Sequence, residues 1–142
     1  MEVREKARRL GQLRALKREV DMLSQRIAGL EPAARGGGRV TENPDDATAA
    51  MLARLRERLD ARRGRCMELL GALYAFIDDI DDSLMRQIMT YRYIDGETWQ
   101  GVAFRIGERD EQYPRRLHNR YLAGHEVPSM AEADGNDEES AV

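Results

Sequence analysis

A stripe of hydrogen-bonding side chains near the C-terminal end is the part of the sequence best suited to chemistry. If residues 111–122 form a helix, then Gln112, Arg115, Arg116 and Asn119 lie on one face of it, because they follow one another at positions i, i+3, i+4 and i+7. Arginine can bind the edge of guanine with two hydrogen bonds, and glutamine or asparagine can bind adenine in the same way. The major groove of DNA is wide enough for one helix. We therefore predict that this face reads DNA bases.

Other polar side chains flank this stripe and are expected to contact phosphates. About half or more of the hydrogen bonds between proteins and DNA go to phosphate and sugar, and basic side chains make many of them. An arginine-rich helix face is in many proteins only a solvated surface, and composition alone leaves that alternative open. The predicted phosphate contacts are Arg105, Arg109, His118 and Arg120.

The segment that must position these side chains consists of three short helical patterns. Gly96 and Gly107 separate the patterns, and helix breakers at this spacing predict a three-helix helix-turn-helix unit over residues 81–122. Thr98 is expected to cap the second helix, and the acidic run at residues 78–82 is expected to cap the first. The inward face of the last helix is predicted to consist of Tyr113, Leu117 and Tyr121.

Two long helices are predicted before this unit, over residues 2–30 and from Asp45 or Asp46 to about Ile80. Apolar residues recur in both at steps of three and four, which is a heptad pattern. The intervening residues 31–45 contain a Glu-Pro stop and three consecutive glycines, and they predict a flexible loop.

These patterns predict an all-α fold in which a long helical hairpin is followed by the helix-turn-helix unit. We expect residues 1–80 to form the hairpin within one chain, with dimerisation through exposed parts of the same helices. A parallel coiled-coil dimer through the first helix is the alternative. Either arrangement makes a homo-oligomer, with a dimer favoured.

The charge of the chain is unevenly distributed. Six of the 26 acidic residues and none of the 23 basic ones lie in residues 123–142, so the residues before them carry a net charge of +3 although the whole chain carries -3. We predict that residues 123–142 are a disordered acidic tail. The basic excess of the remainder suits a nucleic-acid partner without demanding one.

Few residues in the sequence are suited to catalysis. Cys66 is the single cysteine, and His118 and His125 are the two histidines, so no disulfide, metal-ligand set or Cys–His pair is predicted. We expect no enzyme and no cofactor. Because the sequence lacks an apolar run near 18 residues and is charged from its start, we expect a cytoplasmic protein without a membrane span or signal peptide.

One part of the sequence resembles a known family. The string RYIDGETWQGVAFRIG, followed after a short gap by RRLHNRYL, resembles the C-terminal segment of phage-encoded RinA/ArpU-like late transcription regulators. It is similar, more remotely, to the helix-turn-helix of sigma-factor region four. The resemblance implies that residues 98–106 form the positioning helix and residues 111–122 the DNA-reading helix. The sequence departs from the family at EQYP, where the reading helix begins.

The resemblance implies a sequence-specific regulator of transcription, encoded by a phage or prophage, with double-stranded DNA as its partner. Two alternatives stay open. Similar helix-turn-helix units occur in packaging proteins, so the chain can also be a small-terminase-like component whose long helices build a ring. The other alternative is a helical adaptor whose C-terminal unit binds a protein such as RNA polymerase.

Overall fold

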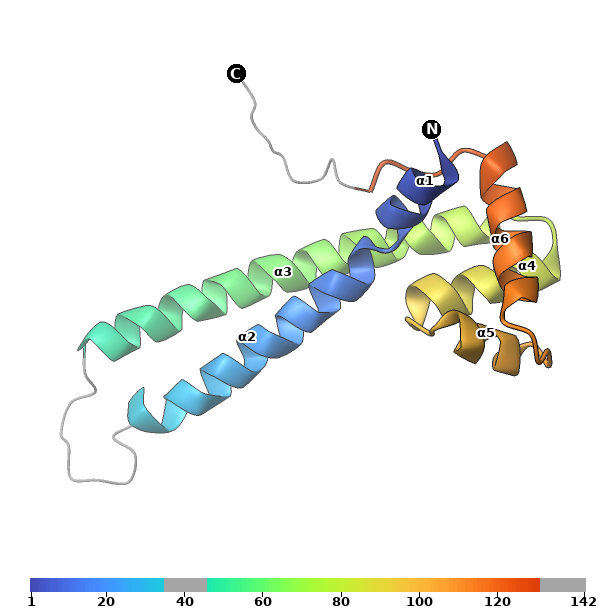
Figure 1. The fold of residues 1–142 in the computed structure, drawn as a ribbon. Helices are drawn as coiled ribbons and strands as arrows, with labels where there is room; N and C mark the ends of the chain where they lie inside the picture. The colour runs from blue at the N-terminus through green and yellow to red at the C-terminus, as the bar shows by residue number, and fades with distance from the viewer. Residues whose placement is uncertain (35–45, 131–142) are drawn as a thin grey trace, which may run out of the picture. The chain divides into compact units, whose positions relative to one another are not determined.

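A computed structural model describes residues 1–34 and 46–130, and all regular secondary structure within these ranges is helical (Figure 1). The prediction of an all-α fold is therefore confirmed. No helix in the described ranges is long and apolar enough to cross a membrane. The elements are α1 (Val3–Leu10), α2 (Gln12–Ala34), α3 (Asp46–Asp78), α4 (Ser83–Met89), the π-helical turn η1 (Thr90–Ile94), α5 (Trp99–Arg105) and α6 (Gln112–Gly124).

The chain forms two compact units, which are described separately. Unit 1 comprises Met1–Ala15 and Met67–Val142, and unit 2 comprises Leu16–Cys66. The division predicted at residue 80 differs from this one. The reason is that both ends of the predicted arm belong with α6: α1 packs against α6, and Phe76 of α3 meets Tyr121 of α6 edge-on, with ring centroids 6.4 Å apart.

Unit 2 is an antiparallel helical hairpin made by parts of α2 and α3. Glu19 pairs with Arg62 at 3.0 Å and Glu31 pairs with Arg56 at 2.8 Å, so partners later in α2 meet partners earlier in α3. The apolar seam follows the predicted heptads and confirms the predicted hairpin. Its buried core is formed by Leu23, Ile27, Leu52 and Leu59, with Val20, Leu30 and Leu55 packed against it.

The first predicted helix differs from the structure at two points. Gly11 ends α1, so the predicted rod is two helices, α1 and α2. A Cβ at Gly11 would lie 3.3 Å from the carbonyl oxygen of Ala7, which explains why a residue without a side chain fits there. Pro32 does not stop the helix, because α2 continues to Ala34. Near a helix end a proline removes only one intrahelical hydrogen bond, its own. Within the loop predicted over 31–45, residues 35–45 lie outside the described ranges.

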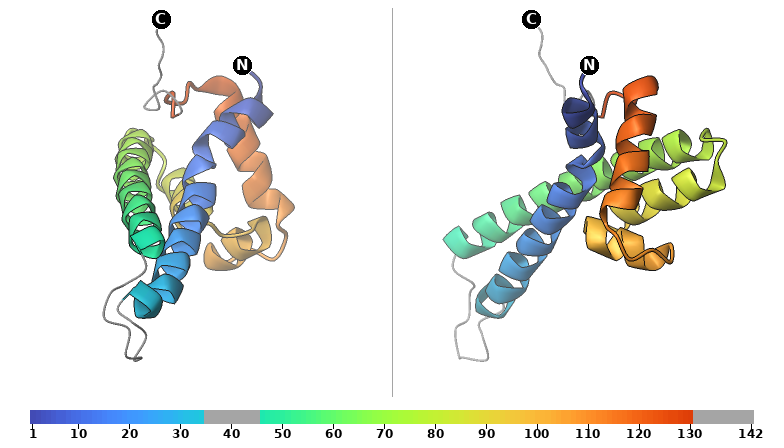
Figure 2. Two further views of the ribbon diagram at one scale, coloured as in Figure 1. Left: turned by 90° about the vertical axis from the view of Figure 1, so that its left-hand side faces the viewer. Right: turned by 45° about the vertical axis from the view of Figure 1, so that its right-hand side comes forward.

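Unit 1 is arranged around α6, which packs against α1, α4 and α5 (Figure 2). Its core draws on every helix of the unit, so the apolar faces of these short elements are covered by one another. The fully buried apolar side chains include Leu10, Leu13, Leu73, Ile80, Ile88, Met89, Val102, Ala103, Pro114, Leu122 and Met130.

The contact between α1 and α6 includes a cap for the C-terminal end of α6. The Lys6 ammonium donates hydrogen bonds to the carbonyl oxygens of Leu122 and His125, each at 2.6 Å. The last carbonyl groups of a helix lack intrahelical partners and carry the negative end of its dipole, so a cation stabilises them. This region corrects the prediction that the tail begins at residue 123: α6 includes Gly124, and Met130 is buried. Residues 131–142 lie outside the described ranges.

Replacing Lys6 with methionine is expected to destabilise unit 1. Methionine keeps an apolar stem but cannot donate to the two carbonyl groups, and a hydrogen bond from a charged donor contributes about 2 kcal/mol to the free energy of unfolding. Urea unfolding followed by circular dichroism measures the change. Arg8→Met is the matched control on α1, because the ion pair between Arg8 and Glu5 is exposed and its loss should leave the unfolding curve unchanged. Equal stability of the two variants would contradict the assigned cap.

Candidate nucleic-acid interface

The turn between α5 and α6 is built by local capping contacts. The hydroxyl oxygen of Thr98 accepts a hydrogen bond from the N–H of Gly101 at 3.0 Å, which confirms Thr98 as the N-cap of α5. At the other end, the N–H of Glu108 donates to the carbonyl of Ala103 at 2.8 Å and Gly107 adopts φ +83°. This is the Schellman geometry, in which a left-handed glycine ends a helix. The predicted turn at Gly107 is confirmed.

The first helix of the predicted unit ends in a π-helical turn. Asp82 caps its start, accepting from the N–H of Met85 at 2.9 Å, as the acidic run predicts. From Thr90 the backbone widens, and the N–H of Asp95 donates to the carbonyl of Thr90 at 3.0 Å, five residues back. Gly96 then adopts φ +73°, a left-handed conformation that suits glycine, and it separates the first two helices as predicted. The helical run therefore ends where the sequence pattern places its end, and its last turn is π-helical.

The π-helical turn brings three consecutive side chains against neighbouring helices. The Cζ atom of Arg105 lies 5.1 Å from the ring centroid of Tyr91. Arg92 lies over the Trp99 ring with its Cζ atom 4.5 Å from the centroid, and it donates to the carbonyl of Glu97 at 2.9 Å. Tyr93 is buried against α6. A regular helix would spread three consecutive side chains over most of its circumference. Such π-helical turns are rare and are often found at functional sites.

His118 lies in the interior of unit 1, with 2 % of its surface exposed. Its Nε2 atom lies 2.6 Å from the Tyr93 hydroxyl and its Nδ1 atom lies 2.9 Å from Oδ1 of Asn119. The Trp99 ring packs edge-on against it, with centroids 4.8 Å apart. Burial lowers the pKa of His118 to about 4, so the ring is neutral near pH 7. The prediction that His118 contacts phosphate is wrong, because the side chain is buried and uncharged.

A single arrangement of protons satisfies this cluster. The Oδ1 atom of Asn119 can only accept, so Nδ1 of the neutral His118 ring carries the hydrogen and donates it. Nε2 is then an acceptor, and the Tyr93 hydroxyl donates to it. The chain of hydrogen bonds therefore runs from Tyr93 through His118 to Asn119, and it leaves the amide N–H groups of Asn119 directed elsewhere.

The outer face of α6 carries the predicted polar stripe. Buried residues recur every four positions at Pro114, His118 and Leu122, and they mark the inward side. The predicted inward residues Tyr113, Leu117 and Tyr121 are only half-buried, so they flank that side and do not form its centre. Pro114 fits because its missing N–H falls in the first turn. The side chains of the predicted stripe are all exposed: Gln112, Arg115, Arg116 and Asn119.

The remaining predicted phosphate contacts lie in different settings. Arg109, in the turn, and Arg120, on α6, are exposed. Arg105 is exposed but already pairs with Glu97 at 2.9 Å, so its guanidinium group is partly engaged within unit 1. Sequence reasoning missed Arg92 and Tyr93. The run TYRYI could have indicated them, because it places large side chains at consecutive positions, and one face of a regular helix cannot bury them all.

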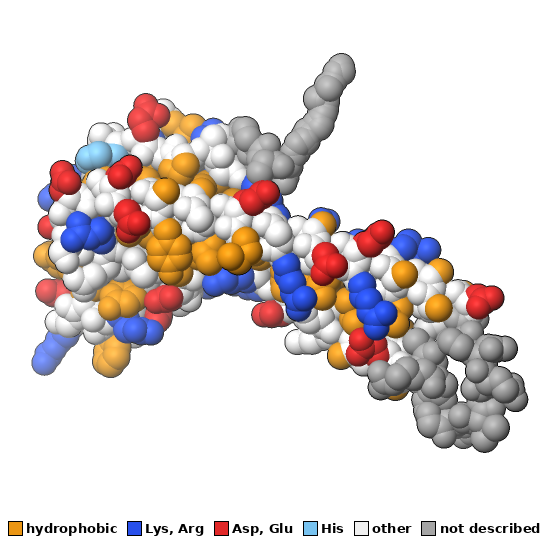
Figure 3. Space-filling view, turned by 180° about the vertical axis from the view of Figure 1, so that it is seen from behind, with side chains coloured by type: hydrophobic (Ala, Val, Ile, Leu, Met, Phe, Trp, Pro, Cys, Tyr) orange, Lys and Arg blue, Asp and Glu red, His pale blue; other side chains and the backbone are white. Residues whose placement is uncertain are grey.

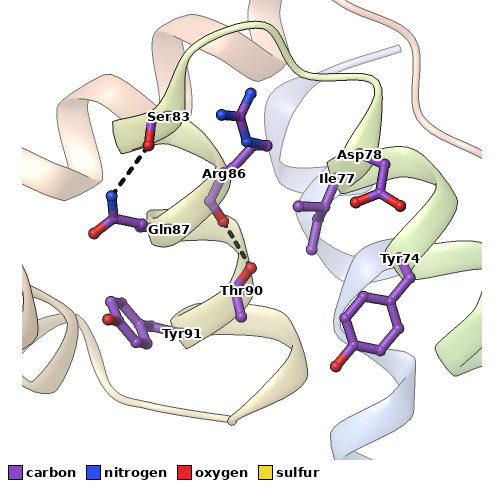
Figure 4. A pocket seen from close by; sticks show the side chains of 8 residues that line it. All are labelled: Tyr74, Ile77, Asp78, Ser83, Arg86, Gln87, Thr90 and Tyr91. Atoms are coloured by element: carbon purple, nitrogen blue, oxygen red, sulfur yellow. Dashed lines mark hydrogen bonds between the residues drawn. The ribbon is translucent and has the colours of Figure 1, made fainter.

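A hollow of about 280 Å³ separates the end of α3 from α4 and η1 (Figure 4). Its polar groups are largely satisfied by one another. Gln87 donates to the Ser83 hydroxyl at 3.3 Å, and the Thr90 hydroxyl donates to the carbonyl of Arg86 at 2.7 Å. The Arg86 guanidinium donates to the carbonyls of Ile80 and Asp81 at 2.5 and 3.0 Å. These contacts indicate that the residues around the hollow join α3 to α4.

The described residues have two other features that bear on chemistry, the distribution of metal-ligating side chains and the single cysteine. No cluster of three or more His, Cys, Asp or Glu residues that could hold a metal ion occurs in the described ranges. Cys66 is half-buried, and burial raises the pKa of its thiol. A raised pKa keeps the thiol protonated at neutral pH, whereas nucleophilic cysteines have lowered values.

No protein-family model, curated protein or solved structure matches this chain. The resemblance to phage late transcription regulators therefore stays a prediction.

Unit 1 is expected to lose stability in acid because of His118. The unfolded chain binds a proton below about pH 6.5, whereas the folded protein does so only near pH 4. Stability is therefore complete above pH 6.5 and falls as the pH drops to 4, by about 3 kcal/mol in all. His118→Gln keeps a donor and an acceptor without a titrating ring, so its free energy of unfolding should fall less over this range. Urea titrations between about pH 7 and pH 4.5 measure the difference.

His125→Gln is the comparison variant: it removes the exposed histidine, whose Nδ1 atom lies 2.8 Å from the carbonyl oxygen of Tyr121, and it leaves His118 in place. It should keep the fall in stability in acid that His118→Gln reduces. Parallel pH curves for the wild type and His118→Gln would contradict the assignment of a buried, neutral His118.

Proposed function

We propose that this chain is a sequence-specific DNA-binding protein of the cytoplasm that places α6 in the major groove. The proposal includes a role in phage or prophage transcription, which rests on the sequence resemblance. One observation carries the DNA-binding proposal: the exposed face of α6 bears Gln112, Arg115, Arg116 and Asn119, while Pro114, His118 and Leu122 hold the opposite face in the core.

The dimensions and chemistry of α6 support this proposal. The helix has 13 residues, about 20 Å at 1.5 Å per residue, and side chains along its whole length are exposed on one side. It contains three arginines and no acidic residue, so its outer face attracts phosphates as well as base edges. The acidic residues nearby lie in the preceding turn, where Asp110 accepts from the N–H of Gln112 at 2.9 Å and helps to start the helix.

Dimerisation would give the protein two reading helices, and we propose that unit 2 supplies the contact. A homodimer with two α6 helices can bind two half-sites of a symmetric operator. Apolar side chains remain exposed on the helices of unit 2, where Met22 and Met51 are each 46 % exposed. Sedimentation separates the candidate roles, because a dimer supports regulation and a ring of many subunits supports DNA packaging.

The adaptor hypothesis is favoured by a different observation. Phe104 on α5 is 81 % exposed, and a large exposed aromatic side chain is typical of a protein-binding surface. Figure 3 shows one face of the molecule, on which hydrophobic side chains lie exposed between acidic and basic ones. If the chain shows no salt-dependent binding to duplex DNA, both DNA hypotheses are excluded and a protein partner such as RNA polymerase becomes the leading candidate.

Replacing Arg115 and Arg116 together with alanine is expected to weaken DNA binding without unfolding the protein. Each bidentate contact with a base contributes about 1–3 kcal/mol, so the double variant should lose about 2–6 kcal/mol of binding free energy. Fluorescence anisotropy measures this, with duplexes selected from a random pool and at two salt concentrations. Circular dichroism should show unchanged helix content.

The matched control replaces Arg54 and Arg63 of unit 2 together with alanine. Both side chains are exposed, and the change in net charge is the same. Equal DNA affinity of the two double variants would show that α6 does not read the DNA.

A further inference from the structure

A second hollow in unit 1, of about 310 Å³, lies between α1, η1, α5 and α6. Three arginines line it from three different elements: Arg4 of α1, Arg92 of η1 and Arg115 of α6. Trp99 and Asn119 also line the hollow. Basic residues distant in the sequence thus meet at one hollow, although each lies in a different helical element.

Most hydrogen-bonding groups that line this hollow are donors, and the Tyr93 hydroxyl oxygen and Oδ1 of Asn119 are the acceptors among them. Arginine has five N–H donors and no acceptor. Asn119 adds two amide N–H donors, and its Oδ1 atom already accepts one hydrogen bond, from Nδ1 of His118 at 2.9 Å. His118 also lines the hollow, and both of its ring nitrogens are already hydrogen-bonded. Because donors outnumber acceptors on this wall, a ligand with several acceptors suits it best.

Within the described part of the chain, the arginines of this hollow make no ion pair. No carboxylate pairs with Arg4, Arg92 or Arg115 in the described part of the chain; Glu97, which is close in sequence to Arg92, pairs with Arg105 instead. Burial lowers the pKa of Arg92, and the charges of Arg14 and Arg115 lower it further. Cations that repel one another beside a hollow are stabilised when an anion enters it.

We propose that this hollow is a binding site for a phosphoryl group. Arginine is the residue best suited to phosphate, because its planar fork donates two parallel hydrogen bonds. The volume lies near the lower end of that of small-molecule sites, which suits a phosphate group with at most a small organic part. The phosphate can come from a free phosphorylated molecule or from the backbone of DNA. For DNA as the source, the inference rests on the proposed function; for a free ligand it does not.

Trp99 makes the site directly measurable. It is the single tryptophan of the chain and it lines the hollow, so its fluorescence reports on occupancy. The full chain is titrated with inorganic phosphate and with pyrophosphate, against potassium chloride at equal ionic strength. We expect a saturable change in emission with the phosphate compounds only. Arg115→Gln and Arg4→Gln should each weaken that binding about tenfold or more, since each removes a charged donor.

Two neighbouring substitutions serve as contrasts. Arg8→Gln removes an exposed arginine of α1 that pairs with Glu5 and does not line the hollow, so pyrophosphate should bind as in the wild type. Arg116→Gln removes the charge next to Arg115 from the outer face of α6, and it should weaken binding to DNA but not to pyrophosphate. Circular dichroism confirms that each variant is folded.

The source of the phosphate is decided by competition. If pyrophosphate displaces a bound duplex and Arg115→Gln lowers the salt dependence of DNA binding by about one counter-ion, the site holds a backbone phosphate. If pyrophosphate binds without affecting DNA binding, or if no DNA binds at all, the site takes a free phosphorylated molecule. The proposal is overturned if the titration gives no saturable change in Trp99 emission, or if Arg115→Gln gives the same change as the wild type. This holds whatever the DNA result.

Discussion

The hydrogen bond between the Tyr93 hydroxyl and Nε2 of His118 joins η1 to the buried side of α6, and much of unit 1 depends on it. A histidine can lie in this interior only if its ring is neutral and both ring nitrogens have partners, because an unsatisfied or charged imidazole would be costly there. Tyr93 supplies one partner and Asn119 the other. The π-helical turn is what allows Tyr93 to reach α6 while its neighbours Tyr91 and Arg92 contact α5.

This bond is the middle one of three attachments that fix α6. At its N-terminal end the helix follows the glycine turn and is started by the Asp110 carboxylate. At its C-terminal end the carbonyl groups are capped by Lys6 of α1. A helix held at both ends and in its middle has little freedom to rotate, so its exposed face is set by the core. Such support is what a binding surface needs, since preformed groups lose less entropy when a ligand arrives.

The parts of this fold that the sequence predicted are those that local rules decide. Asp82, Thr98, Gly96 and Gly107 act within a few residues of their own positions, and the heptads of the hairpin are repeated often enough to be read directly. The packing of α1 on α6 brings together Lys6 and Leu122, which are 116 residues apart in the sequence. A periodic pattern within one helix does not predict such a contact. His118 was misplaced for the same reason. As a polar residue it was counted among the phosphate contacts, and its burial depends on a tyrosine 25 residues earlier.

The burial of His118 also changes how the polar stripe of α6 can be used. Gln112 and Arg116 are exposed and do not line the second hollow, whereas Arg115 and Asn119 do. To bind adenine bidentately, asparagine must accept with its oxygen and donate with its nitrogen at the same time. His118 already donates to that oxygen, so one of its two lone pairs is used within the protein and one is left for a ligand. A face that looks uniform in the sequence therefore divides into two parts. Gln112 and Arg116 lie on the outward part alone, whereas Arg115 and Asn119 are exposed on the same face and also line the hollow that α1 helps to form.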